Sequence, residues 1–405
     1  MDSSTQLFID ETAAGYFDDP YAHYAPIRAA NPVHHDPRGP WMVFGYDDVK
    51  RVLRGPGISS RLANAPDTPR TQRLVEAWGT GIITKPHLSR ADPPEHTRLR
   101  RVLAAAFTPR HMEALRPRIR EIVDELLVGA GDEIEVGAQL ARPLPYRVMC
   151  ELLGYPPDTD DSLMIECTHA FVVATMEPFM DGAQVDAVVR ANKLLTEQIR
   201  DAVEWKRDHL GDDLMSLLLN AGDEREVLSE DEVVEQVRLL FAAGHETTVN
   251  AVELALLSLL RNRDQWDLLV GNPDLIDNAV EELLRYDNTI QIAWRTTPDD
   301  FELGTATIPA GNDVIGWIGS ANRDPAKWGP AADRLDVTRQ DAGDHLSFGS
   351  GLHLCLGAWL ARAELQELLR TLAARYPAMD LAGEVPWERL VSVRGPERLD
   401  LRLRG

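Results

Sequence analysis

The stretch His345-Leu-Ser-Phe-Gly-Ser-Gly-Leu-His-Leu-Cys-Leu-Gly357 carries the clearest information about the fold. Its glycines surround one cysteine, Cys355, just before a run with helical periodicity. Glycine lets the backbone adopt positive φ angles and pass close to a bulky group. Backbone N–H groups at a helix start also lower the pKa of a nearby thiol. Cys355 is therefore a candidate nucleophile, metal ligand or haem ligand, and the plainer alternative is a small buried hydrophobic residue.

The composition excludes several broad classes of protein. The 405 residues contain 42 Lys and Arg against 65 Asp and Glu, which gives a net charge of −23. This acidity argues against nucleic-acid binding and against a polybasic membrane anchor. The first residues lack a signal-peptide pattern, and no apolar run reaches the roughly 18 residues that a membrane span needs. Three scattered cysteines do not make a disulfide framework. We expect a cytoplasmic protein that binds neither nucleic acid nor a membrane.

Helical periodicity dominates most of the chain. The strongest helix is expected from about Ser229 to Leu260, where Ser229 and Glu232 form a capping-box signature. At ~1.5 Å per residue this helix would be about 45 Å long, enough to cross a whole domain. No linker, repeat or low-complexity tract interrupts the chain. The sequence predicts one large domain, residues 1–405, that is mainly α with a smaller β region (α+β). We expect residues 66–287 and 356–376 to be mainly helical, and residues 1–65, 288–345 and 381–405 to be β-rich.

A second unusual segment, Ala243-Gly244-His245-Glu246-Thr247-Thr248, lies inside the long helix. Gly244 and two adjacent threonines are poor choices for a helix interior. Threonine hydroxyls can bond to the carbonyl four residues earlier and bend the helix. Glu246 and Thr247 place an acid beside an alcohol, a pair suited to moving protons. A surface glutamate would leave this cluster unexplained, whereas His245 is expected to be a packing or surface residue rather than a ligand.

Three motifs together resemble one known family. Phe348-x-x-Gly351-x-His353-x-Cys355-x-Gly357 is similar to the haem-binding signature of cytochromes P450. The segment from Ala243 to Thr248 resembles the oxygen-activation motif of that family. Glu282-Leu-Leu-Arg285 resembles its Glu-x-x-Arg motif. The complete cysteine signature is highly specific, whereas Glu-x-x-Arg alone would be weak.

The likeness covers essentially the whole chain. Asn31-Pro-Val-His and Trp41-Met-Val-Phe-Gly-Tyr look like the N-terminal region of bacterial P450s, and the resemblance implies the cytochrome P450 fold with a long helix over the haem. One departure concerns the wall beside the cofactor. Many relatives have proline before an apolar residue that faces the haem, but here Thr289 precedes Ile290, which removes a backbone constraint.

The resemblance implies haem b, with the Cys355 thiolate as axial ligand of the iron. The two haem propionates need cationic partners, and His96 and Arg100 are i, i+4 neighbours that would share a helix face. Arg295 and His353 match the remaining propionate ligands. The other residues that the resemblance places against the haem are Ala243, Gly244, Phe348, Gly349 and Gly357. The residues that it places in a buried structural network are Glu282, Arg285 and Arg334.

The activity that the resemblance implies is monooxygenation, in secondary metabolism or catabolism. Glu246 and Thr247 would deliver protons while one oxygen atom from O2 enters an organic substrate by hydroxylation or epoxidation. The expected pocket is nearly all apolar, which favours a small apolar substrate held by shape. Its residues would be Ile82, Ile83, Phe171, Val172, Leu239, Ala243, Ile290, Ile292, Ala293 and Val393. Because the chain has no dinucleotide fingerprint, flavin domain or cysteine cluster, we expect electrons from a separate ferredoxin and ferredoxin reductase.

Two alternatives stay open on the sequence alone. A peroxide-driven peroxygenase would keep the haem, although a proton relay through Glu246 and Thr247 serves dioxygen. A non-enzymatic haem- or metal-binding module is the other alternative, for example a zinc site built from His345, His353 and Cys355. Zinc prefers four ligands, and the fourth is missing from this set.

Overall fold

The computed structural model describes residues 8–78, 84, 86–157, 161–176, 182–220 and 228–404. The chain forms two compact units. The first contains Met1–Asp67, Leu254–Cys355 and Val385–Glu397, and the second contains Thr68–Glu253, Leu356–Glu384 and Arg398–Gly405. Because the chain passes repeatedly from one unit to the other, neither is a consecutive stretch of sequence, and the single domain stays a prediction.

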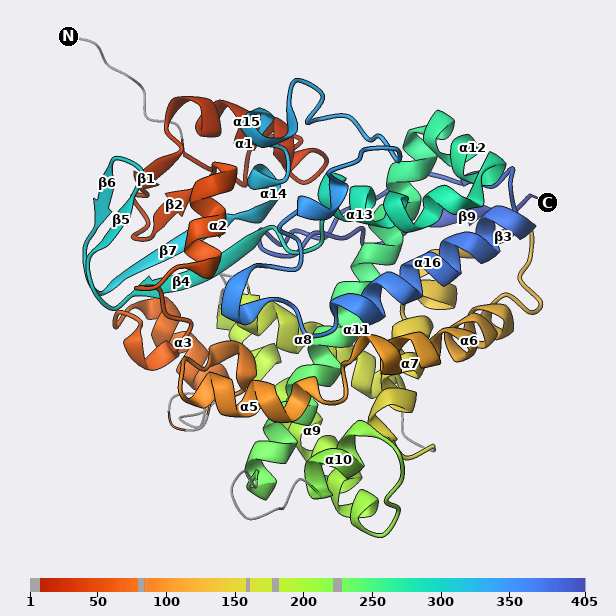
Figure 1. Ribbon diagram of the computed structural model, residues 1–405, viewed down its shortest axis with the longest axis horizontal. Coiled ribbons are helices and arrows are strands. Elements are labelled where there is room, and N and C mark those ends of the chain that lie inside the picture. Colours follow the sequence, from red (N-terminus) through yellow and green to blue (C-terminus); the bar gives the residue numbers. More distant parts are fainter. Residues whose placement is uncertain are drawn as a thin grey trace. The chain divides into compact units, whose positions relative to one another are not determined.

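A four-stranded sheet organises the first unit. The strand order is β1 (Val33–His35), β2 (Trp41–Val43), β7 (Asn312–Trp317) and β4 (Ile292–Thr297), with β2 and β7 parallel and the other pairs antiparallel. Helix α2 (Tyr46–Arg54) packs on β7 (Figure 1). The core between them contains Val43, Val49, Val52 and Val314, all fully buried.

The rest of the first unit is a strand pair and several helices. The pair is β5 (Phe301–Leu303) with β6 (Ala306–Ile308). The helices are α1 (Pro20–Ala30), α12 (Arg263–Gly271), α13 (Ile276–Tyr286), α14 (Ile318–Ala321) and α15 (Pro325–Trp328).

The expectation that residues 1–65 are β-rich is wrong. This segment has two strands of three residues but also α1 and α2. Helix α1 begins with Pro20, and the Asp19 side chain accepts a hydrogen bond from the Ala22 N–H. Helix α2 is only nine residues long and lies between Gly45 and Gly55. The glycines made this short segment resemble a loop, whereas burial of Val49 and Leu53 on the sheet stabilises a helix.

The second unit is mainly helical. Its helices are α3 (Pro69–Trp78), α5 (Glu95–Ala104), α6 (Pro109–Leu126), α7 (Pro143–Leu153), α8 (Asp161–Met176), α9 (Gly182–Arg207), α10 (Leu214–Asn220) and α16 (Ala358–Arg375). Helices α6 and α16 run side by side (Figure 1), and the buried Glu367 of α16 binds Arg116 and Arg120 of α6 at 3.1 and 2.9 Å. A small sheet has the order β3 (Glu133–Glu135), β9 (Asp400–Arg402) and β8 (Asp380–Leu381).

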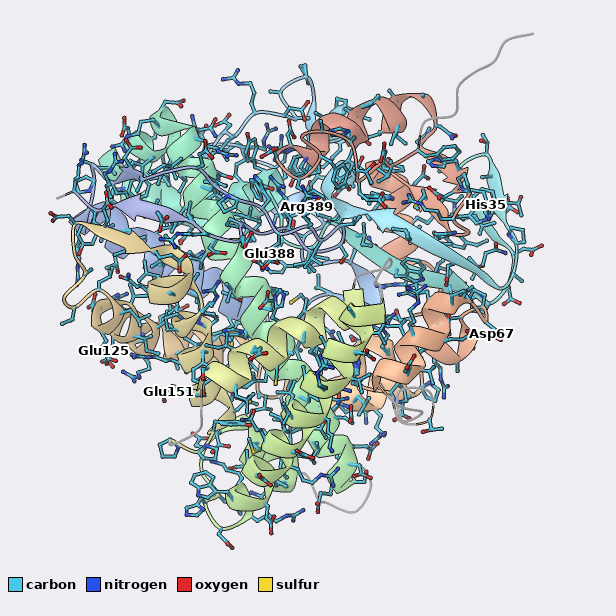
Figure 2. The ribbon with its side chains drawn as sticks, turned by 180° about the vertical axis from the view of Figure 1, so that it is seen from behind. His35, Asp67, Glu125, Glu151, Glu388 and Arg389 are labelled. Atoms are coloured by element: carbon cyan, nitrogen blue, oxygen red, sulfur yellow. The ribbon has the colours of Figure 1, made fainter. Side chains whose placement is uncertain are left out.

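Acidic side chains on α6 and α7 form exposed ion pairs. Figure 2 labels two of them, Glu125 and Glu151. Arg118 donates to Glu151 at 2.8 Å and to Glu125 at 3.1 Å, and Arg147 donates to Glu125 at 3.0 Å. Such exposed pairs contribute only ~0.2–1 kcal/mol each to stability.

Helix α11 (Glu230–Arg261) is the predicted long helix. It has 32 residues, which at ~1.5 Å per residue makes about 48 Å. The capping box is present, because the Ser229 N–H donates to Glu232 Oε2 at 2.7 Å and the Glu232 N–H donates to Ser229 Oγ at 3.3 Å. The predicted class, mainly α with a smaller β region, is confirmed. Among the helices described, none has both the length and the apolar character needed to cross a membrane.

Candidate active site

The residues expected around the cofactor fall into two groups, one in each unit. In the first unit, the loop that carries Cys355 is held by its own backbone. The Cys355 N–H donates to the Phe348 carbonyl at 2.8 Å, and Gly349 and Gly351 both have φ of +73°. A Cβ at Gly351 would lie 2.8 Å from Arg54 Cα, so the backbone can approach α2 only with glycine here. The loop leaves the Cys355 thiol exposed.

The segment before this loop is anchored to α13. Ser347 Oγ donates to the Leu284 carbonyl at 2.7 Å and accepts from the Asn322 side chain at 2.8 Å. Asn322 also accepts the Leu346 N–H at 2.8 Å. Three polar contacts from one asparagine and one serine therefore fix the direction in which the chain enters the cysteine loop.

His345 also takes part in the contacts that hold the segment before the cysteine loop. Its ring is buried, Nδ1 accepts the Ser347 N–H at 3.1 Å, and Nε2 lies 3.3 Å from Glu281 Oε2. These contacts occupy a residue that the zinc alternative requires. Within the described parts of the chain, no group of three or more His, Cys, Asp or Glu side chains is placed to hold a metal ion.

A buried ion pair on α13 is connected to the segment that leads into the cysteine loop. Arg285 binds Glu282 through two parallel bonds of 2.7 and 2.8 Å, and both side chains are 0% exposed. The pairing of Arg334 differs from the expectation, because Arg334 contributes its main-chain carbonyl to Arg285 at 3.0 Å. The second guanidinium on Glu282 belongs to Arg339, at 3.2 Å. Arg285 also donates to the Asn322 carbonyl at 2.8 Å, which connects this pair to the anchor of the cysteine loop.

The first unit also brings together two residues expected in the substrate pocket that are about a hundred positions apart. Ile290 and Val393 form an antiparallel bridge, flanked by bonds from the Gln291 N–H to the Ser392 carbonyl (2.8 Å) and from the Arg394 N–H to the Thr289 carbonyl (2.7 Å). These hydrogen bonds fix the segment around Ile290, where Thr289 stands in place of the proline of many relatives. Val393 is buried, as are Ile292 and Ala293 on β4. On the same strand, half-buried Arg295 donates to the Trp294 carbonyl at 2.8 Å.

In the second unit, both threonines of the α11 motif make the expected bonds to their own helix. Thr247 Oγ1 donates to the Ala243 carbonyl at 2.7 Å, and Thr248 Oγ1 donates to the Gly244 carbonyl at 3.0 Å. Ala243 is exposed and Thr247 is half-exposed, whereas Thr248 is buried. Ala243 and Thr247 are one turn apart, so they form an open strip on a helix that is otherwise largely covered.

Gly244 has a packing role that the sequence did not reveal. A Cβ there would lie 2.6 Å from Met149 Sδ and 3.3 Å from Met149 Cγ. Met149 lies on α7 and is 1% exposed, so it has little room to move. Glycine at this position lets α7 and α11 approach each other closely.

Glu246 is paired with a histidine of α8. Its Oε1 lies 2.8 Å from His169 Nδ1, and the Glu246 side chain is only 8% exposed. Burial alone would raise the pKa of Glu246, but the hydrogen bond and charge of His169, with the nearby His245 and Arg142, lower that pKa below its ordinary value. The carboxyl is therefore ionised at neutral pH.

His96 and Arg100 lie on α5 at i and i+4, as expected. His96 is 2% exposed and Arg100 is half-buried. Phe171 and Val172 of α8 and Leu239 of α11 are buried. Ile82 and Ile83 lie outside the described residues.

A cation that the sequence reading overlooked lies beside these apolar positions. The Arg238 guanidinium stacks over the Phe171 ring at 5.6 Å and donates to Asn192 at 2.6 Å. Arg238 directly precedes Leu239 in α11, so a buried guanidinium lies next to the apolar residues of this helix.

The profile of the cytochrome P450 family matches residues 164–269 and 270–382 of this chain. The chain belongs to the cytochrome P450 family. This P450 is 37% identical over 399 residues to the P450 monooxygenase PikC of Streptomyces venezuelae, with 95% of this chain and 91% of that protein covered. It is also 37% identical over 399 residues to the vitamin D(3) 25-hydroxylase of Pseudonocardia autotrophica, with 96% and 94% covered.

A solved structure gives the same result for the fold. P450BioI, in a complex with an acyl carrier protein ligated to hexadec-9Z-enoic acid, matches this P450 with a TM-score of 0.88 and 31% identity. The match covers 96% of this chain and 100% of that one. Members of the family are haem-thiolate proteins whose iron is bound by a cysteine, and relatives of this P450 include monooxygenases and hydroxylases. The protein is therefore a haem-thiolate monooxygenase that uses dioxygen and an organic substrate.

The residues present fit a haem. The Cys355 thiol is exposed at the end of a loop with two left-handed glycines, which is suitable for an axial ligand. Ala243 and Thr247 offer a strip of small side chains on α11, against which a flat ring can lie. Each unit also offers a half-buried guanidinium, Arg295 in the first and Arg100 in the second, of the kind that binds carboxylates. The relatives do not favour the peroxygenase or the non-enzymatic module.

Two more residues that sequence reasoning missed, besides Arg238 and Met149, are Arg339 and His169. Arg339 follows Asp336-Val-Thr, and no local pattern connects it to Glu282. His169 had a weak signal, since Thr168 and His169 interrupt the apolar face of α8 just before Phe171 and Val172. Buried polar residues need hydrogen-bond partners, so this interruption indicated that Thr168 and His169 contact polar groups elsewhere in the fold.

Proposed function

We propose that Cys355 binds the iron of haem b, and that Glu246 and Thr247 supply protons while this P450 hydroxylates or epoxidises a small apolar organic molecule. The observation that carries the proposal is the exposed Cys355 thiol on a loop fixed by the Phe348 carbonyl, Asn322 and Ser347. We further propose that the electrons come from a separate ferredoxin and ferredoxin reductase, which are typical redox partners of bacterial P450s.

The bound haem, with a thiolate on its iron, supplies the activation of dioxygen. Residues of the chain would bind the haem and transfer the protons. His96, Arg100, Arg295 and His353 would hold the two propionates by charge-assisted hydrogen bonds. The Thr247 hydroxyl donates to the Ala243 carbonyl at rest, and it can turn to guide a proton. The ionised Glu246 carboxylate accepts a proton from the solvent side and passes it toward Thr247.

The apolar residues expected in the pocket favour an apolar substrate. Ile290, Ile292, Ala293 and Val393 in one unit, and Phe171, Val172 and Leu239 in the other, offer shape rather than hydrogen bonds. The names of the relatives agree with this proposal, because one is a vitamin D(3) 25-hydroxylase and another structure is bound to epothilone D. We place the substrate among such apolar compounds of secondary metabolism or catabolism.

The test of the function is a substrate screen with two electron sources. A panel of apolar compounds is first ranked by optical difference spectra of the haem-loaded protein. Binders are then incubated with NADPH, ferredoxin and ferredoxin reductase, or with hydrogen peroxide alone. We expect oxygenated product only in the first reaction. Product with peroxide alone, at a higher rate, would instead indicate the peroxygenase.

Thr247 should control how consumed electrons are used. In Thr247→Ala, NADPH consumption is expected to continue while product falls by about 10²-fold, the usual contribution of a positioned proton-transfer group. The electrons from NADPH that no longer lead to product should reduce dioxygen to hydrogen peroxide. The measurement is NADPH consumed, product formed and peroxide released with one accepted substrate.

Thr248→Ala is the matched control for Thr247. Thr248 makes the same kind of bond to its helix but is buried, because one residue is about 100° around the helix axis. This variant should stay coupled. Equal loss of product in both variants would show that these hydroxyls only shape the helix.

The cationic residues should control haem retention. In Arg100→Ala and Arg295→Ala, loss of a charge-assisted bond worth ~1.5–3 kcal/mol should speed haem transfer to apomyoglobin by about tenfold or more. Arg398→Ala is the control, since Arg398 is 62% exposed and pairs with Asp400 at the surface. Equal transfer rates in the three variants would contradict the propionate assignment.

A further inference from the structure

Helices α8 and α11 meet through two consecutive side chains on each. Thr168 Oγ1 lies 3.1 Å from His245 Nδ1, and His169 Nδ1 lies 2.8 Å from Glu246 Oε1. All four residues belong to the second unit. The two contacts resemble each other in geometry but differ in chemistry, because one joins neutral groups and the other joins an acid to a base.

The His245 contact is a fixed, uncharged one. Burial lowers the pKa of His245, so the ring is neutral at physiological pH. Its Nε2 lies 3.1 Å from the Arg142 carbonyl, which can only accept, so Nε2 carries the proton. Nδ1 is then an acceptor facing Thr168 Oγ1, whose single proton is shared between this ring nitrogen at 3.1 Å and the Ile165 carbonyl at 2.8 Å. This contact connects α8 to α11 and does not change its charge in the range where enzymes work.

The Glu246 contact can exchange protons with water. The His169 side chain is 42% exposed, whereas that of Glu246 is 8% exposed, so the imidazole is the solvent-side member of the pair. In the part of the chain that the structure describes, His245 on the same helix and Arg142 at the start of α7 also lower the pKa of Glu246. Histidine is the side chain that ordinarily changes charge between about pH 5 and 8.

We propose that His169 is a positioning residue that holds Glu246 and feeds it protons from solvent. The inference rests on the proposed role of Glu246. Charged His169 passes its Nδ1 proton to Glu246 Oε1, and the imidazole becomes neutral as the carboxylate becomes a carboxylic acid. Glu246 then gives that proton toward Thr247, and His169 regains one from bulk water. One proton enters and one leaves, so both groups return to their charged forms.

The proposal fixes the direction of the pH dependence. His169 is charged at low pH, so proton supply is greatest there and declines as pH rises through the titration of the ring. The electron flow limited by this step should follow the same curve. Replacing His169 with asparagine keeps a donor near Oε1 but removes the titration, which separates proton supply from simple hydrogen bonding.

The experiment compares the haem-loaded parent with His169→Asn, Glu246→Gln and Thr168→Val. NADPH consumption with ferredoxin and ferredoxin reductase, without substrate, is measured between about pH 6 and 8.5, where histidines titrate. We expect the parent to slow as pH rises, and His169→Asn to lose this dependence and to be about tenfold slower at the low-pH end. Thr168→Val breaks only the neighbouring contact and should keep the profile of the parent.

A second measurement reports on the pair without turnover. NMR of the histidine rings, with the His169 signal assigned by its loss in His169→Asn, gives the titration midpoint of that ring. In Glu246→Gln the midpoint should fall by about one pH unit, the equivalent of a tenfold change in proton affinity. An unchanged midpoint would overturn the pairing on which the proposal depends.

The outcomes distinguish this inference from the proposed function. If Glu246→Gln alters the profile but His169→Asn does not, the role of Glu246 stands and the role of His169 is wrong. If Glu246→Gln has no effect, the proposed proton role of Glu246 fails first. If Thr168→Val loses the profile as well, the contacts serve only to pack α8 on α11.

Discussion

The Cys355→Ser variant is expected to lose the thiolate-type absorption of its reduced carbon monoxide complex completely, together with all monooxygenase activity. A serine hydroxyl keeps the size of the side chain, but it cannot supply the thiolate that distinguishes this class of haem protein. The loop itself should survive, because the bond from the residue 355 N–H to the Phe348 carbonyl involves only backbone. The measurement is the optical spectrum of the reduced, carbon monoxide-bound protein.

Cys150→Ser is the matched control for this change. Cys150 lies on α7 and belongs to the second unit. Its replacement should leave the spectrum unchanged. A thiolate-type spectrum that persists in Cys355→Ser, or that disappears in Cys150→Ser, would make the ligand assignment wrong.

The largest effect on folding is expected for Arg285→Ala. Glu282 and Arg285 are both 0% exposed, and removal of the guanidinium strands a buried carboxylate. Breaking one partner of a buried pair costs ~3–5 kcal/mol. Three main-chain carbonyls, those of Asn322, Ala332 and Arg334, also lose their donor. Urea denaturation followed by circular dichroism should show a strong fall in the free energy of unfolding, with haem lost earlier than in the parent.

Arg263→Ala separates burial from charge. Arg263 donates to Asp267 at 2.9 Å, one turn further along α12, but both side chains are largely exposed. Such a pair is worth ~0.3–0.5 kcal/mol, so the denaturation midpoint should barely move. Similar midpoints for Arg263→Ala and Arg285→Ala would contradict the structural role given to the buried pair.

The motifs that can be identified from the sequence are local. The glycines and Cys355, the Glu246–Thr247 pair, the capping box at Ser229 and the Glu282–Arg285 spacing each lie within a few residues of one another. Spacing along one helix or one loop determines which side chains share a face, so sequence is enough to relate them. The long helix α11 was predicted for the same reason, since helical periodicity repeats over many turns.

The partners of these residues were decided by tertiary structure. Arg339 binds Glu282 from 57 positions away, and His169 binds Glu246 from 77 positions away. Met149 explains Gly244 by packing, and burial on the sheet makes α2 a helix between two glycines. These contacts depend on which surfaces the fold brings within a few ångströms, and no local pattern encodes that distance. The sequence by itself determined the haem-thiolate class, and the tertiary structure decided which side chains pair with or pack against the residues of these motifs.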